Sequence, residues 1–276
     1  MTLIKKQPKR LFTFGCSFTK WIWPTWANVI AYELDVPLYN YGYSGAGNQY
    51  IFNAIIQADS HYKFNDEDLI MVCWTNVCRE DRLHNGHWLC PGNIYTQGIY
   101  DQSCVKKWAD PFGYAVRDFA SIKATWELLD KTGCQFHFMK MLDFENIDQF
   151  NLDNKENFSK LENIYDYYLV KIKKSFYEVL WNNNLDNKYK KEKELFGEKY
   201  HDGHPTIKEH LIYLENVFDY TFSEKTKNIV NQTYNDIIRE IAIQHCNKVN
   251  SWQINLKKYY FNNSEPTFLI GTRYGE

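Results

Sequence analysis

The chain has 276 residues, long enough for one large domain or two small ones at about 150 residues per domain. Its 32 Lys and Arg residues nearly balance 34 Asp and Glu residues, giving a formal charge of −2. A protein that mainly binds nucleic-acid phosphates would show a basic excess, so this class is excluded. Aromatic residues make up 17% of the chain and glycines number only 13, which excludes collagen-like and disordered classes.

The seven cysteines are scattered and form no Cys-x-x-Cys pair or Cys/His cluster of the kind that binds metal. An odd number without clustering favours a reducing compartment over a disulfide framework. The apolar run from Leu11 to Phe14 is too short for a signal peptide, and no stretch has the length of a membrane span. We expect a cytoplasmic protein that needs no metal or cofactor and binds neither membrane nor nucleic acid. Its oligomeric state stays open.

The first half of the chain alternates short apolar runs with helical patterns, which indicates a parallel sheet connected by crossover helices. Strands are expected at Leu11 to Phe14, Pro37 to Asn40, Asp68 to Trp74 and Gln135 to Met141. Helices are expected at about Thr25 to Leu34, Gln49 to Ala58 and Asp118 to Lys131. The segment between Trp74 and Asp118 is rich in loops, which in a compact domain are often functional.

The second half of the chain is expected to add an insertion and further helices to this sheet domain. An insertion over about 142–199 contains one helix around Leu161 to Trp181, and a capping box from Thr206 to Glu209 starts another helix. A last helix covers about Lys225 to His245. We therefore predict an α/β domain over 1–222 and a C-terminal helical extension over 223–276. A fifth strand is the weak point, because no clear apolar run precedes Tyr200.

A serine follows the first strand, in Gly15-Cys16-Ser17. Its hydroxyl would lie at the carboxyl edge of the sheet, near helix amides that favour developing negative charge, so the position suits a nucleophile. The alternative is an ordinary serine in a tight turn or at an N-cap. Three other polar segments stand out: Asn40-Tyr41-Gly42-Tyr43-Ser44-Gly45, Trp74-Thr75-Asn76 and Asp202-Gly203-His204-Pro205.

The order of these four segments resembles the SGNH (GDSL-like) hydrolase superfamily, in which successive loops supply serine, glycine, asparagine and histidine. Ser17 matches the nucleophile, although in Gly-Cys-Ser where the family usually has Gly-Asp-Ser. Gly45, Asn76 and His204 match the other three residues. The resemblance covers Leu11 to Phe218 as separate islands. It implies a flavodoxin-like three-layer α/β/α sandwich with a central parallel sheet of about five strands.

The resemblance also implies a mechanism. His204 would take the proton from Ser17 as its hydroxyl attacks an ester, and the N–H groups of Ser17 and Gly45 with the Asn76 amide would bind the oxyanion. The family's acid stands three residues before the histidine, where this chain has His201. Asp202, two residues before, is our candidate acid. The alternatives are a backbone carbonyl that orients the histidine in a dyad, and a capping role for Asp202.

Candidates for substrate binding lie next to the matched residues: Trp21, Trp23, Trp74 and Arg79. Packing explains Trp74 equally well, and a solvated loop explains Arg79. Cys16 is expected to be buried rather than nucleophilic.

The sequence thus predicts a serine esterase for small acyl esters, such as O-acetyl groups on carbohydrate, with a small-molecule or glycan ester as its partner. The alternatives are an O-acyltransferase that uses the same residues and a non-catalytic module that binds carbohydrate or protein.

Overall fold

The central sheet of the computed structural model is parallel and has the strand order β6-β3-β1-β2-β7. Its strands are β1 (Arg10–Phe14), β2 (Leu38–Asn40), β3 (Asp68–Trp74), β6 (Gln135–Lys140) and β7 (Asn263–Ser264). Every residue of β3 is buried, as expected for a central strand with both faces covered. The structure describes residues 2–96, 100–144, 152–181, 204–246, 263–264 and 272–273.

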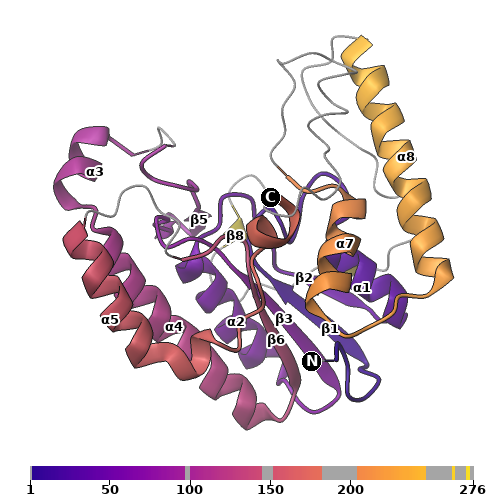
Figure 1. Cartoon of the computed structure of the whole chain (residues 1–276), viewed down its shortest axis with the longest axis horizontal. Helices are drawn as coiled ribbons and strands as arrows, with labels where there is room; N and C mark the ends of the chain where they lie inside the picture. Colours follow the sequence, from indigo (N-terminus) through magenta and orange to yellow (C-terminus); the bar gives the residue numbers. More distant parts are fainter. Residues whose placement is uncertain are drawn as a thin grey trace.

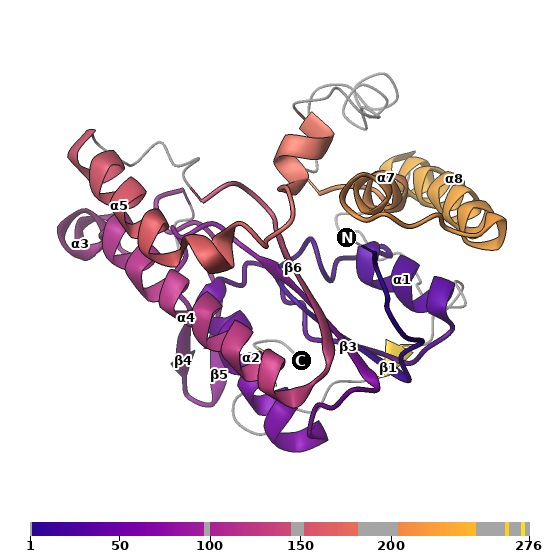
Figure 2. The same ribbon diagram turned by 60° about the horizontal axis from the view of Figure 1, so that its bottom comes forward.

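Helices cover both faces of this sheet (Figures 1 and 2). One layer contains α1 (Trp26–Leu34), α7 (Ile207–Val217) and α8 (Glu224–Cys246), and the other contains α2 (Asn48–Tyr62), α4 (Pro111–Thr132) and α5 (Leu152–Leu169). The apolar faces of both layers pack on one continuous core. The predicted three-layer α/β/α architecture with a central parallel sheet is therefore confirmed.

Capping residues set where two of the helices begin. Thr206 forms the predicted capping box of α7, since its hydroxyl accepts from the amide of Glu209 and the Glu209 carboxylate accepts from the amide of Thr206. Helix α4 begins seven residues before the predicted start, because Asp110 caps it and Pro111 occupies the first turn, where its missing N–H costs nothing.

The predicted single helix from 161 to 181 is wrong. Helix α5 ends at Leu169, and a π-helical turn, η1 (Tyr177–Trp181), follows after a break. Within the break, the amide of Lys173 donates to the carbonyl of Phe138 at 2.9 Å, and Ser175 forms a bridge to Lys140. The chain leaves the helix because β6 is an edge strand whose free backbone groups supply other hydrogen bonds.

The loop-rich segment after β3 contains local structure. Strands β4 (Arg82–His84) and β5 (His87–Leu89) form a hairpin, and Asn85 and Gly86 between them have positive φ values of 48° and 80°. Asn-Gly is the residue pair that a two-residue hairpin turn prefers, so the sequence carried a signal for this hairpin. A short helix, α3 (Gln102–Trp108), follows, and β8 (Thr272–Arg273) pairs with β5.

The fifth strand of the main sheet comes from the far end of the chain. β7 pairs in parallel with β2 and lies more than 60 residues beyond Tyr200, before which the sequence has no clear apolar run. Residues 182–203 lie outside the described residues. Helix α8 falls in the predicted C-terminal extension, which also contributes β7 and β8 to the two sheets. Across the described parts of the chain, no helix combines the length and the apolar character needed to cross a membrane.

Candidate active site

The matched loops meet at the carboxyl edge of the sheet. Phe14 near the end of β1 pairs with Val72 near the end of β3, so the segments carrying Ser17 and Asn76 leave adjacent strands at the same edge. The loop after β2 is tied to the first segment, because the amide of Tyr43 donates to the carbonyl of Gly15 at 3.1 Å. Parallel strands thus gather residues that lie far apart in the sequence.

A tight turn after β1 presents the serine. The carbonyl of Cys16 accepts from the amides of Thr19 at 2.9 Å and Lys20 at 3.2 Å, which folds the chain back directly after Ser17. A Cβ on Gly15 would lie 2.1 Å from the Thr19 hydroxyl oxygen, so the turn needs glycine there. Ser17 is only 6% exposed.

The structure brings Ser17 and His204 together. Oγ of Ser17 lies 2.8 Å from Nε2 of His204, within hydrogen-bond distance. His204 precedes the capping box of α7, so the start of that helix fixes the backbone around it. A serine hydroxyl hydrogen-bonded to an imidazole nitrogen is the geometry that activates a serine nucleophile.

Two tryptophans from the segment after Ser17 hold this histidine. The ring of Trp21 stacks on the His204 imidazole, with centroids 3.6 Å apart and an interplanar angle of 17°. The indole N–H of Trp23 donates to the carbonyl of Pro205 at 2.9 Å. Trp23 is 2% exposed, so its contacts are those of a packing residue, whereas Trp21 is half-buried beside the histidine. The β1–α1 segment therefore carries the serine and also positions its partner.

Gly45 and Asn76 have hydrogen-bonding groups available. In the part of the chain that the structure describes, the Asn76 side-chain amide has no hydrogen-bond partner. Its Oδ1 is buried. The backbone N–H groups of Ser17 and Gly45 likewise have no partner among the described residues. Gly45 has a φ of +77°, and a Cβ there would lie 2.1 Å from the carbonyl oxygen of Cys90. Only glycine fits this position.

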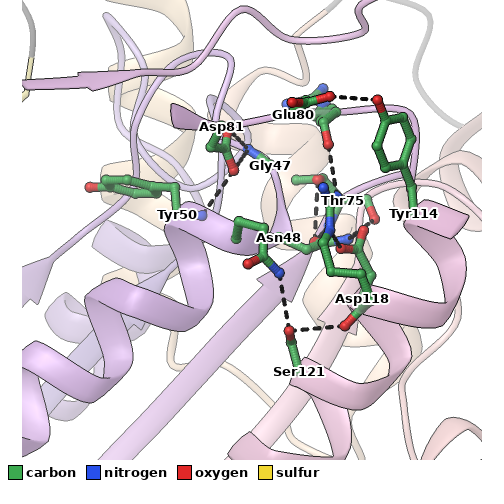
Figure 3. A network of polar contacts seen from close by, with 12 residues as sticks. Gly47, Asn48, Tyr50, Thr75, Glu80, Asp81, Tyr114, Asp118 and Ser121 are labelled. Carbon is green, nitrogen blue, oxygen red and sulfur yellow. Dashed lines mark hydrogen bonds and ion pairs between the residues drawn. The ribbon is translucent and has the colours of Figure 1, made fainter. Parts of the chain in front are cut away.

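A buried polar network supports the segment that contains Asn76 (Figure 3). The Asn48 amide group bonds to both backbone groups of Thr75, accepting from its N–H at 2.8 Å and donating to its carbonyl at 3.1 Å. Asn48 also donates to the Asp118 carboxylate at 2.8 Å, and Arg117 pairs with Asp118 at 2.7 Å. Burial raises the pKa of Asp118 to about 6, against the opposing effects of Arg117 and Asn48.

A second buried carboxylate supports the glycine loop. Asp81 accepts from the amides of Gly47 at 2.8 Å and Tyr50 at 2.8 Å, at the start of α2. Burial raises the pKa of Asp81, and these two amides act against the shift. Nη1 of Arg79 donates to the carbonyl of Ala46 at 2.7 Å. The predicted substrate-binding residue Arg79 therefore contacts the backbone directly after Gly45.

Of the remaining residues discussed from the sequence, two are buried in the core and one lies outside the described residues. Trp74 is fully buried and packs edge-on against Phe138, so the structure places it in the core rather than beside His204. Cys16 is fully buried, as expected, with its thiol 3.4 Å from the Met141 sulfur. Asp202 lies outside the described residues, and its role as the acid stays a prediction.

Sequence reasoning missed Asn48 and Asp118. Asn48 directly follows the glycine-bearing turn, which is a weak signal that its side chain serves that loop. Asp118 had no such signal, because it lies on an amphipathic helix and only the packing of α2 against α4 shows that it faces inward.

Solved structures similar to this chain include the following two. A member of the lipolytic protein G-D-S-L family from Veillonella parvula DSM 2008 is 14% identical with a TM-score of 0.40, over 77% of this chain and 99% of that one. A GDSL-like lipase from Bacteroides thetaiotaomicron VPI-5482 is 13% identical with a TM-score of 0.39, over 82% of this chain and 92% of that one. No protein-family model and no curated protein matches the sequence. The sheet order and site geometry of the chain itself show an α/β/α fold, with its serine, glycine and asparagine loops at one edge of the parallel sheet and its histidine against the serine.

Proposed function

We propose that the protein is a serine esterase that hydrolyses small acyl esters, with Ser17 as nucleophile and His204 as general base. The observation that carries this proposal is the 2.8 Å distance between Ser17 Oγ and His204 Nε2. The available N–H groups of Ser17, Gly45 and Asn76 support it further, because a developing oxyanion needs such donors. Acetyl esters of carbohydrates are the proposed substrates.

In the proposed mechanism, Ser17 Oγ attacks the ester carbonyl carbon while its proton passes to Nε2 of His204. The tetrahedral oxyanion accepts hydrogen bonds from the Ser17, Gly45 and Asn76 N–H groups, each typically worth about 3 kcal/mol. The intermediate then collapses, and His204 returns the proton to the leaving alcohol. Water attacks the acyl-serine in the same way, and this step releases the acid. Asp202 is the proposed partner that orients His204.

The same geometry bears on the alternatives. A binding module that has lost catalysis has no need for a serine hydroxyl within hydrogen-bond distance of an imidazole, so the short distance favours an enzyme. An O-acyltransferase would use the same residues with a different acceptor in place of water, and product analysis with candidate acceptor sugars separates the two reactions.

Substitution of Ser17 tests the proposal. We expect Ser17→Ala to abolish hydrolysis of p-nitrophenyl acetate and labelling by a fluorophosphonate probe, because both reactions need the nucleophilic oxygen. Ser60→Ala is the matched control, since Ser60 is exposed on α2 and bonds only to the helix backbone. Wild-type activity or labelling in Ser17→Ala would exclude Ser17 as the nucleophile.

A further inference from the structure

A cavity of about 320 Å³ lies between α3, the start of α4 and the segment that follows Asn76. It is lined by the aromatic side chains of Tyr100, Trp108 and Tyr114 together with the charged side chains of Glu80 and Arg82. Its volume lies in the range of small-ligand sites, which are concave, largely aromatic or apolar, and carry a few fixed polar groups. In Figure 1, α3 lies on the opposite flank of the molecule from α7 and α8.

The polar groups of this cavity are held in place and still have hydrogen-bonding capacity. The Glu80 carboxylate accepts from the Tyr114 hydroxyl and from Arg82, and the Tyr100 hydroxyl donates to the Glu80 carbonyl at 3.0 Å. A carboxylate offers about four acceptor sites, so Glu80 can accept further hydrogen bonds. The Arg82 guanidinium lies over the Tyr100 ring, 5.4 Å from its centroid. The lining is therefore organised before any ligand arrives.

Trp108 forms the open side of the cavity. It is 73% exposed, and no other tryptophan with a described side chain is exposed. Nζ of Lys107 lies 4.9 Å from the centroid of the Trp108 ring. A ligand that covers the remaining exposed indole surface would lower the free energy of the system. Such a ring beside fixed polar groups is suited to a ligand with both apolar faces and hydroxyl groups.

The segment that lines the cavity follows directly on the segment of the proposed active site. Glu80 directly follows Arg79, whose guanidinium bonds to the carbonyl of Ala46 next to Gly45. Glu80 lies four positions after Asn76, so their Cα atoms are at most about 14 Å apart. The proposed oxyanion donor Asn76 and the cavity-lining residues Glu80 and Arg82 therefore belong to one short segment of the chain.

The charge of the lining narrows the chemical class of the ligand. The lining contains the carboxylates of Glu80 and Asp101 and the guanidinium of Arg82. Arg82 pairs with Glu80, and Asp101 caps the start of α3, so these groups leave no unpaired cation to attract an anionic ligand. Aromatic rings can contact the C–H faces of a sugar, while a carboxylate and a guanidinium bind its hydroxyl groups. We infer that this cavity binds the sugar ring of an acylated carbohydrate, the alcohol half of the ester. This inference rests on the proposed function and assigns the sugar half of its substrate to a place in the structure.

The test compares a sugar ester with an ester that lacks the sugar. For Trp108→Ala we expect KM for 6-O-acetylglucose to rise about tenfold, while kcat/KM for p-nitrophenyl acetate stays within about twofold, because the lost contact serves only the sugar. Tyr167→Ala is the control, since Tyr167 is an exposed aromatic residue on α5 that is not part of the cavity lining. Acetate release is measured for both variants and the wild type.

The outcomes separate the inference from the proposed function. Three results would overturn the sugar subsite. In the first, the wild type hydrolyses p-nitrophenyl acetate but not 6-O-acetylglucose. In the others, Trp108→Ala loses activity equally on both esters or changes activity on neither. If the wild type hydrolyses neither ester, the proposed function fails instead. In that case, binding of methyl glucoside, observed by saturation-transfer NMR with the wild type and Trp108→Ala, decides the subsite on its own. Equal signals from both proteins, or none from the wild type, overturn it.

Discussion

The buried Asp118 carboxyl makes the stability of the fold depend on pH. Burial raises the pKa of Asp118 from 3.8 to about 6 in the folded protein, which corresponds to about 3 kcal/mol since one pH unit is worth about 1.4 kcal/mol. The folded state binds this proton more tightly than the unfolded state. The stabilising contribution is therefore fully present below pH 3.8 and is lost as pH rises through about 6.

Asp118→Asn removes this titration while keeping a polar side chain next to Asn48. We expect the free energy of unfolding of the variant, relative to the wild type, to rise by up to about 3 kcal/mol between pH 4 and pH 7. The charged and titratable groups around Asp118 are Arg117, Asp81 and Cys78, and they are present in both proteins, so the difference isolates Asp118.

Urea unfolding at half-unit pH steps measures this difference, provided that both proteins unfold in a two-state manner. Asp219→Asn, an exposed aspartate on the surface, is the control for adding an amide and removing a charge. A difference between Asp118→Asn and the wild type that stays constant from pH 4 to pH 7 would refute a raised pKa at Asp118, and with it the electrostatic description of the network.

Substitutions at three further positions test the parts of the proposed site by kcat on p-nitrophenyl acetate. Asn76→Ala should lower kcat about 100-fold with folding unchanged by circular dichroism, because it removes one oxyanion donor; an unchanged kcat excludes that role. Gly45→Ala should lower kcat to a similar extent, since its Cβ would lie 2.1 Å from the Cys90 carbonyl oxygen and must displace the loop. Trp21→Ala should lower kcat about tenfold by loosening the His204 ring, whereas Trp21→Phe should retain most of it; equal losses in both would argue against stacking as the cause.

Local patterns predicted much of the fold. The strand predicted from Asp68 to Trp74, which is apolar after its first residue, has the bounds that the structure shows, because a short buried strand between helical segments has a strong signal. The capping box at Thr206 located the start of α7 for a similar reason. The predicted helix over 161–181 failed, because backbone groups at the edge of β6 compete with helical hydrogen bonds and such competition has no local signature.

The candidate site also has parts that local sequence predicts and parts that it does not. The residue types and chain order of Ser17, Gly45, Asn76 and His204 could be read directly from the sequence. The roles of Trp21 and Trp23 could not, because each acts on a segment more than 180 residues away, as the 182-residue separation of Trp23 and Pro205 shows. Trp74 stands two residues before the matched Asn76 in the sequence, yet its side chain is buried in the core, because successive side chains of a strand point to opposite faces.

What the sequence by itself determined is the class of fold, the positions of most strands and helices, and the residues that could perform ester hydrolysis. The fold class and its elements follow from periodicity, capping and turn chemistry, which act over a few residues. The candidate residues follow from the resemblance of the motif order to the SGNH hydrolases. Only the tertiary structure decided that Ser17 meets His204, that Asn48 and Asp118 support the Asn76 segment, and that a strand from the end of the chain completes the sheet. Each depends on packing between distant segments, which local patterns do not encode.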